Sequence, residues 1–160
     1  MVTLTNTGGS PDFLLTSGTV KLKTTDGYSL KIAGGFTGSG GLEIDGDVIY
    51  NHAPLGLQNL IMTSGSLARG AGANGDVIVT NSLTLQGLDL DMTGSTLTTS
   101  GADVALNGGT LTTETDLVAK TLRMGGGVLN LTGGAGNDGI TLTGSGSALT
   151  VDGSDLDVAG

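Results

Sequence analysis

The sequence predicts an all-β protein whose C-terminal part is a short-strand β-solenoid, or β-helix. The first observation is an apolar residue at every seventh position, at Leu83, Leu90, Leu97, Val104, Leu111 and Val118. The second is a glycine that keeps the same step, at Gly87, Gly94, Gly101 and Gly108. The third is the Thr and Ser between them, because these residues and glycine disfavour the helix that a seven-residue step otherwise indicates. We therefore expect one short strand per block, with glycine supplying a positive φ at each corner.

Size and composition indicate one domain with a thin aliphatic core. The chain has 160 residues, of which 37% are hydrophobic but only 2% aromatic. Its interior must therefore be a stack of Leu, Val and Ile rather than of large rings. We divide the chain into an N-terminal arm and β-hairpin docking module (1–41), a connecting β and loop region (42–81) and a repetitive solenoid-like region (82–160).

The charge of the chain excludes two classes of partner. With a net charge of −9, the chain lacks the clustered bases that nucleic acid or an anionic membrane requires. No apolar run approaches the roughly 20 residues of a membrane helix. The segment VTLTNTGG after Met1 has neither a basic nor an apolar region, so we expect no signal peptide. The absence of Cys excludes a disulfide framework.

The N-terminal region predicts a docking module. Residues 1–12 are a Thr-rich arm, and residues 13–33 have the alternation of a β-hairpin around Asp26-Gly27. Apolar positions would share one face of this hairpin, and the other face would carry Lys21, Lys23 and Lys31. We interpret these lysines as a solvated face that protects a sheet edge, with docking to an acidic partner surface as the alternative.

From residue 82 the repeat continues in shifted phases. The later positions that would extend the stack are Leu122, Leu129, Leu142, Leu149 and Leu156. Two blocks per coil would give a two-sided coil and three blocks a three-sided coil, and both alternatives stay open. At about 4.8 Å per coil, residues 82–160 would stack about four to six coils. An antiparallel β-meander or sandwich is the structural alternative, since Asn107-Gly108-Gly109 also suits a hairpin turn.

A stack this short has two open ends and exposed strand edges. Capping or association would cover both. We therefore expect a homo-oligomer, and predict a trimer whose strands stack or interleave around a threefold axis.

One segment resembles a calcium-binding repeat. GGAGNDGIT (133–141) matches the nonapeptide G-G-x-G-x-D-x-U-x and is similar to the repeats-in-toxin β-roll. The resemblance implies that Asp138 is a carboxylate ligand and that Gly134 and Gly136 contribute backbone groups. The pattern occurs once, whereas Ca²⁺ takes about six to eight oxygens. We expect no metal or other cofactor and interpret Asp138 as the cap of its own turn, with Ca²⁺ as the alternative.

Acidic residues recur in small clusters along the chain. The groups are Asp45/Asp47, Asp89/Asp91 and Asp152/Asp155/Asp157. An i, i+2 pair places both carboxylates on one strand face, a spacing that a glycosidase could use. The repetitive part contains no aromatic platform for a sugar. We interpret these groups as solvent-facing charge and His52 as a loop residue, and predict no enzymatic activity.

The cadence of LTLQG, STLTTSG and ALNGGTLTT is similar to the repetitive shafts of bacteriophage tail fibres and tailspikes. It is equally similar to bacterial autotransporter passengers, which are β-helices. The resemblance covers residues 82–160 and implies a non-enzymatic structural protein of a phage virion, either a capsid decoration or a tail-fibre component. Such a protein would contact other virion proteins on a virion or cell exterior. A fragment of a surface adhesin passenger is the alternative.

Overall fold

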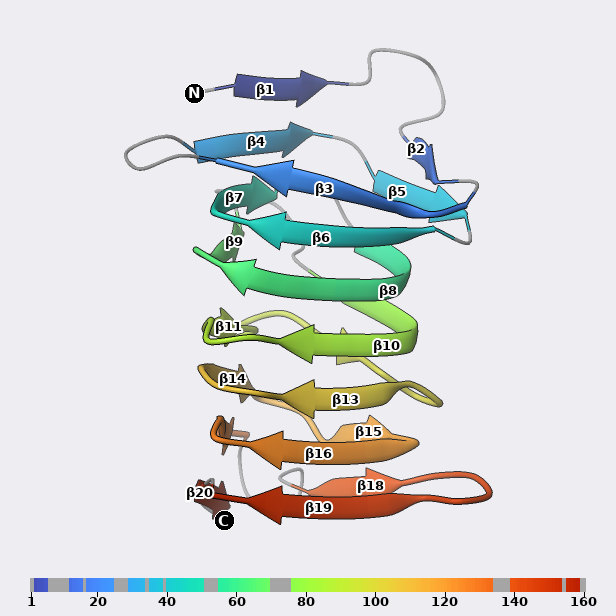
Figure 1. Cartoon of the computed structure of the whole chain (residues 1–160), viewed down its shortest axis with the longest axis vertical. Helices are drawn as coiled ribbons and strands as arrows, with labels where there is room; N and C mark the ends of the chain where they lie inside the picture. Colours follow the sequence, from blue (N-terminus) through green and yellow to red (C-terminus); the bar gives the residue numbers. More distant parts are fainter. Residues whose placement is uncertain are drawn as a thin grey trace.

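The chain folds as a β-solenoid built from parallel strands. The computed structural model describes residues 2–5, 12–15, 17–24, 29–33, 35–38, 40–50, 55–69, 76–133, 139–153 and 155–158. Within these residues the structure is all-β, contains no helix and pairs its strands in parallel. Successive coils stack along the vertical axis of Figure 1. The predicted all-β solenoid is confirmed, and the antiparallel meander or sandwich is wrong.

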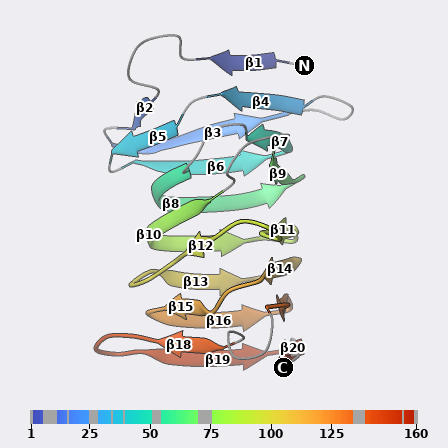
Figure 2. The same ribbon diagram turned by 180° about the vertical axis from the view of Figure 1, so that it is seen from behind.

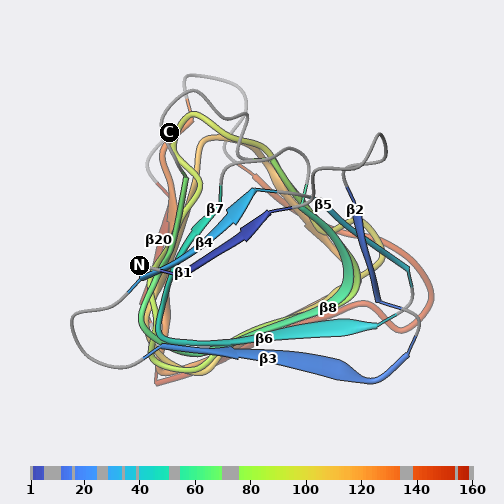
Figure 3. The ribbon, with the colours of Figure 1, turned by 90° about the horizontal axis from the view of Figure 1, so that it is seen from above.

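Each coil has three sides, so the stack is triangular when viewed along its axis (Figure 3). Face 1 holds β2 (Asp12–Leu15), β5 (Gly35–Gly38), the first parts of β8 (Leu55–Ser64) and β10 (Val77–Leu85), β12 (Leu97–Thr98), β15 (Leu117–Ala119) and β18 (Ile140–Leu142). Face 2 holds β3 (Thr19–Lys23), β6 (Gly41–Asp45), the later parts of β8 and β10, β13 (Asp103–Leu106), β16 (Thr121–Gly125) and β19 (Ala148–Asp152). Face 3 holds β1 (Val2–Thr5), β4 (Ser29–Ala33), β7 (Asp47–Tyr50), β9 (Leu67–Arg69), β11 (Leu90–Asp91), β14 (Thr110–Thr113), β17 (Val128–Leu131) and β20 (Asp155–Val158).

The seven-residue step corresponds to one side of the triangle. Leu83 lies on face 2 and pairs with Val104, which is three such steps further along the chain. Leu90 lies on face 3 and pairs with Leu111, again three steps on. The coil in this region is therefore three-sided and consists of three blocks, which decides between the two alternatives that the sequence left open.

The step then contracts, and the contraction displaces Val118 from the interior. Val104 pairs with Leu122 and not with Gly125, where three full steps would end. The shortening arises because Lys120 alone joins β15 to β16, whereas residues 99–102 join β12 to β13. In β15 the buried side chains are Leu117 and Ala119, and Val118 is half-buried. The prediction that Val118 belongs to the core stack is therefore wrong: the buried positions are those immediately before and after it.

The core consists of aliphatic columns that run parallel to the solenoid axis. On face 2, register pairs align two such columns. Their fully buried members are Leu42, Leu60, Leu83, Val104 and Leu122 in one column, and Ile44, Met62, Leu85, Leu106 and Met124 in the other. Other stack positions, Leu90, Leu97, Leu111 and Leu129, are also buried. Aliphatic side chains stack on aliphatic side chains of the neighbouring coil, and this keeps each coil in register. A shift of one residue in the strand pairing would bring outward-facing polar residues into the interior.

The predicted stack fails at the C-terminal coil. Leu149 continues the first face 2 column, yet 47% of it is exposed. Leu142 is only partly buried, and the side chain of Leu156 lies outside those described. The physical reason is that β19 has one neighbouring strand, so the described stack covers its inward side chains from one side only.

Glycines with positive φ make the corners. The predicted set Gly87, Gly94, Gly101 and Gly108 has φ values of 82°, 70°, 83° and 124°, which confirms that part of the prediction. Close approach adds a second requirement at Gly109, where a Cβ would overlap the carbonyl group of Leu88 in the coil before. The corner from face 2 to face 3 is therefore closed to larger residues at that position.

The predicted N-terminal hairpin is wrong. β3 pairs in parallel with β6 on face 2, and β4 pairs in parallel with β1 and β7 on face 3. The proposed turn at Asp26-Gly27 lies outside the described residues. Alternation along residues 19–33 is satisfied equally by two successive sides of a coil, so the parallel stack extends to residues well before 82 (Figure 1).

Candidate functional site

Carboxylates at the corners bond backbone amides of neighbouring coils. Asp76 Oδ1 accepts a hydrogen bond from the N–H of Thr96 at 2.9 Å, and Asp89 Oδ1 accepts one from Thr110 at 2.7 Å. Asp116 Oδ1 accepts from the N–H of Gly139 at 2.8 Å. These carboxylates satisfy amides that the turns leave outside the strand ladders. Their described contacts are therefore structural.

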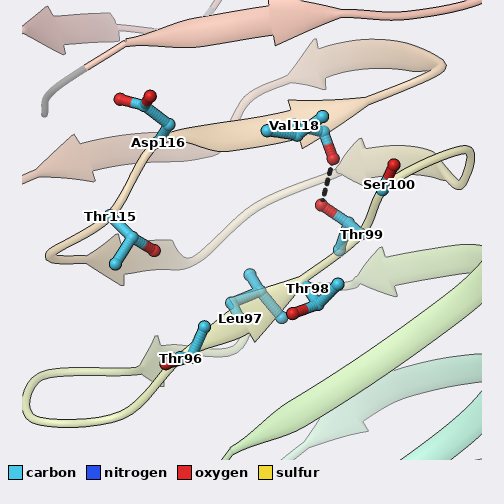
Figure 4. Close-up of a pocket in the computed structure, with 8 residues that line it drawn as sticks. All are labelled: Thr96, Leu97, Thr98, Thr99, Ser100, Thr115, Asp116 and Val118. Atoms are coloured by element: carbon cyan, nitrogen blue, oxygen red, sulfur yellow. Dashed lines mark hydrogen bonds between the residues drawn. The ribbon is translucent and has the colours of Figure 1, made fainter.

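A concavity lies where face 1 lacks a ladder between β12 and β15. β12 pairs with β10 and β15 pairs with β18, but no ladder joins β12 to β15 in the described chain. Both strands are seen on the back of the molecule in Figure 2. A pocket of about 440 Å³ opens between them, lined by Thr96, Leu97, Thr98, Thr99, Ser100, Thr115, Asp116 and Val118 (Figure 4). We refer to it as the β12–β15 pocket.

One side-chain hydrogen bond crosses this pocket. The hydroxyl of Thr99 donates to the carbonyl oxygen of Val118 at 2.7 Å, and Thr99 is 1% exposed (Figure 4). The bond takes the place of the missing ladder at the inner end of the pocket. Towards solvent, Thr98, Ser100 and Asp116 are exposed.

The lining of the β12–β15 pocket offers several hydrogen-bonding groups. Its polar groups are hydroxyls and the carboxylate of Asp116, and its apolar members are Leu97 and Val118. The arrangement can hold a small polar ligand through hydrogen bonds.

Two of the predicted docking lysines are held by carboxylates on the next coil. Lys21 Nζ lies 2.7 Å from Glu43 Oε1 and 3.1 Å from Asp45 Oδ2, and Lys23 Nζ lies 3.4 Å from Asp45 Oδ2. Lys31 belongs to β4 on face 3, so the three lysines do not share the predicted face. The side chain of Lys31 lies outside those described. Lys23 keeps 66% of its side chain exposed.

This cluster shifts the titration of its members. The hydroxyl of Ser64 donates to Asp45 Oδ1 at 2.6 Å, and this bond together with Lys21 lowers the pKa of Asp45 from 3.8 to about 2. Hydrogen bonds to Glu43 and Asp45 raise the pKa of Lys21 above its ordinary value. Both shifts favour the charged forms.

The remaining predicted site residues whose side chains the structure describes lie at separate places on the solenoid. Asp91 accepts bonds from the hydroxyl and the N–H of Thr93, at 2.6 Å and 2.9 Å, which lowers its pKa. Asp47 accepts from the hydroxyl of Ser66 at 3.0 Å. Asp138 and His52 lie outside the described residues, as do the side chains of Asp155 and Asp157. Within the described part of the chain, no three His, Asp or Glu side chains form a group that could hold a metal ion.

Sequence reasoning did not find the β12–β15 pocket. The available signal is the break in the seven-residue step after Val118, because Leu122 and not Gly125 continues the stack. Such a break indicates that two coils pair poorly, because strands of unequal length leave backbone groups without a partner strand. The position of the pocket follows from that mismatch.

Comparison of the chain with protein-family models, with curated proteins and with solved structures found no match. In the part of the chain that the structure describes, no helix has the length and apolarity that spanning a bilayer requires. Function is therefore inferred from the fold, its surface chemistry and the cadence of the repeats.

Proposed function

We propose that this chain is a non-enzymatic structural protein on the exterior of a phage virion, as a capsid decoration or tail-fibre component. The observation that carries the proposal is the stack of parallel strands on face 2 from β3 to β19. Its interior is aliphatic, and corner carboxylates bond neighbouring coils together. Such a stack makes a stiff rod, because each coil contacts only the coils beside it.

The outward positions support an exterior role. Along face 2 the hydroxyl of Thr121 donates to Asp103 on the coil before at 2.7 Å, and the amide of Asn81 donates to Asn59 at 2.7 Å. Hydroxyls, amides and carboxylates on this face therefore bond to each other between coils. A polar, negatively charged surface over a β-rich rod disfavours edge-to-edge aggregation and keeps the rod soluble.

Assembly as a homo-oligomer, with three chains, is part of the proposal. One chain already encloses its own core on three sides (Figure 3). Three copies would therefore associate by their outer faces or stacked ends, and interleaved strands are not needed to complete the interior. At a free end of the rod, other virion proteins would dock near Lys23, where an incoming carboxylate competes with Asp45 for an exposed ammonium group.

A fragment of a bacterial surface adhesin passenger is the second candidate. The observation that favours it is the β12–β15 pocket, whose hydroxyls and Asp116 face solvent as a ligand-binding surface requires. A structural rod has no need of this pocket. In neither role does the proposal invoke a cofactor.

Sedimentation equilibrium of the purified chain tests the assembly directly. The proposal predicts a species of three times the 15.7 kDa chain mass at micromolar concentration. A monomer at every concentration up to about 100 μM contradicts a symmetric oligomer, since affinities this weak bury too little surface to hold a particle component.

Antibody labelling separates the two roles. Antibodies against the chain should label purified phage particles from the organism that encodes it, as seen by immunogold electron microscopy. Label confined to the bacterial surface would instead support the adhesin passenger and contradict the virion role. Preimmune serum and particles from an unrelated phage are the controls.

A further inference from the structure

The C-terminal coil presents inward-facing apolar side chains that the described chain leaves uncovered. Leu149 and Val151 on β19 are 47% and 45% exposed. Their register partners on β16, Leu122 and Met124, are 1% and 0% exposed. The two exposed residues therefore occupy core positions of the solenoid at the edge of its last described coil.

The opposite end of face 2 has the same construction. Among the described strands, β3 has β6 as its one neighbour on this face. Val20 is 41% exposed, while its register partner Leu42 is fully buried. Leu22, two positions on, is 8% exposed and heads the second core column. Both ends of face 2 thus expose an inward apolar position and an unpaired strand edge.

We propose that two copies of this chain stack head to tail, with β3 of one copy pairing in parallel beside β19 of the other. The partner is a second copy because the two edges carry matching positions of one repeating ladder. Following the register from coil to coil, Val20 occupies the column of Leu149 and Leu22 occupies the column of Val151. Stacking therefore continues both core columns across the junction.

Charge is complementary at the same junction. Lys23 follows Leu22 on β3, and Asp152 follows Val151 on β19, so the two residues occupy equivalent positions at one corner. Within the chain, Lys23 meets Asp45 across one coil at 3.4 Å. In the stacked pair Asp152 would approach Lys23 from the other side with the same one-coil offset. An ammonium group between two carboxylates is favourable, although an exposed pair of this kind contributes little to stability, so it favours one orientation of the contact more than it stabilises it.

The same features disfavour a contact between two identical ends. β19 reads ALTVD and contains no lysine, so a tail-to-tail pair would bring together strands whose one charged residue is Asp152. That pair would also have to be antiparallel, unlike the strand pairs of the described solenoid. A head-to-tail contact is heterologous and joins copies into rows along the axis.

This contact goes beyond the proposed function, because it would join copies of a virion rod or of an adhesin alike. It also differs from a lateral trimer, which leaves the ends free. Its test must therefore report the end-to-end junction itself and not the total number of chains in a particle.

Disulfide trapping in this cysteine-free chain provides that readout. Lys23→Cys and Asp152→Cys are made in separate chains with different tags, mixed and oxidised. Parallel partners on adjacent strands lie about 4.8 Å apart, within disulfide reach. We expect a mixed-tag dimer of twice the chain mass on a non-reducing gel, with each variant alone mainly monomeric. As a control, Lys120→Cys, at an exposed position on the coil before the last, mixed with Asp152→Cys should give at least tenfold less dimer.

Adding Leu149→Asp to the Asp152→Cys chain should reduce the mixed dimer at least tenfold, whereas Thr132→Asp, at an exposed position on another coil, should leave it unchanged. Circular dichroism confirms that each variant is folded. The proposal is overturned if Asp152→Cys alone dimerises as efficiently as the mixture, which would show a tail-to-tail contact. It is equally overturned if the mixed dimer does not exceed the Lys120→Cys control.

Discussion

At the scale of single residues, glycine determines where the coil can turn. Gly87 and Gly109 both have positive φ, at 82° and 74°. Around Gly87 there is open space, while a Cβ on Gly109 would overlap the backbone of Leu88. The first position requires glycine for its backbone conformation alone, and the second also because two coils approach closely.

Alanine substitution should therefore separate these two requirements. Gly87→Ala is expected to lower the free energy of unfolding by about 1–2 kcal/mol, from the left-handed backbone alone. Gly109→Ala should lower it by about 2–5 kcal/mol, because steric overlap with the neighbouring coil is added. Urea denaturation followed by circular dichroism measures both. Equal losses would contradict the close approach of coils at this corner.

The cluster around Asp45 makes stability depend on pH. The folded-state pKa of Asp45 is about 2, below the ordinary 3.8, so the native state binds this proton less readily than the unfolded chain. The stabilising contribution is thus complete above pH 3.8 and is lost as the pH falls towards 2. Because Asp91 also has a lowered pKa, it contributes in the same direction.

Two measurements check this acid dependence. Carbon-detected NMR of the Asp45 carboxyl should give a titration midpoint near 2. The urea midpoint of the wild type should also fall more steeply below pH 3.8 than that of Asp45→Asn, which cannot titrate at this position. A carboxyl midpoint at the ordinary 3.8 would show that Ser64 and Lys21 do not hold Asp45 in solution.

At the scale of elements, β12 and β15 are neighbours on face 1 that, among the described residues, no strand ladder joins. Each pairs with its other neighbour, and the Thr99 hydroxyl bond to Val118 crosses the gap. Thr98 beside it is exposed and faces outward. Thr98 and Thr99 are adjacent residues of the same type, and only Thr99 is buried and bonded to Val118. Thr98 can therefore serve as the control for a substitution of Thr99.

Removing the crossing hydroxyl should loosen this join. Thr99→Val is expected to lower the free energy of unfolding by about 0.5–1.5 kcal/mol, since one buried hydrogen bond is lost at nearly constant volume. Amide exchange in β12 and β15 should accelerate more than in β13 and β16. Thr98→Val is the control and should change neither quantity; a matching effect at Thr98 would contradict the role assigned to Thr99.

The sequence predicts where strands and corners lie better than it predicts which strands pair. The step from Leu83 to Leu111 predicts the strands and corners of that region because each block is the same length and ends in glycine. Alternation in residues 19–33 indicates which side chains are buried but not which strand lies alongside, and the hairpin prediction failed for that reason. The β12–β15 pocket lies where coil lengths become unequal around Val118. The sequence shows a change of phase in the seven-residue step there, but not which two strands lose their ladder.

At the scale of the whole molecule, stability should decline from the middle of the stack to its ends. Leu106 is fully buried between coils on both sides, whereas Leu149 in the same face is 47% exposed. Each coil gains its apolar contacts from its two neighbours, so a terminal coil has about half of them. Two leucines at core positions can therefore contribute unequally to the free energy of unfolding, depending on how near they are to an end of the stack.

Leucine-to-alanine substitution measures this gradient. Leu106→Ala should cost about 2–5 kcal/mol of unfolding free energy, as expected for a cavity in a packed core. Leu149→Ala should cost about 0.5 kcal/mol or less in an unassociated chain, because its side chain is already half in water. Urea denaturation at low protein concentration measures both, and a loss at Leu149 equal to that at Leu106 would contradict the open end.

The three-sided parallel coil is the premise of the fold, the assembly and the end-to-end contact. Through-hydrogen-bond scalar couplings measured by NMR on the deuterated chain test it most directly. The structure predicts couplings from the N–H of Asn107 to the carbonyl of Leu85 and from the N–H of Gln86 to the carbonyl of Met62. A coupling from Asn107 to a carbonyl only two blocks earlier in the chain, or to an antiparallel neighbour, would contradict it.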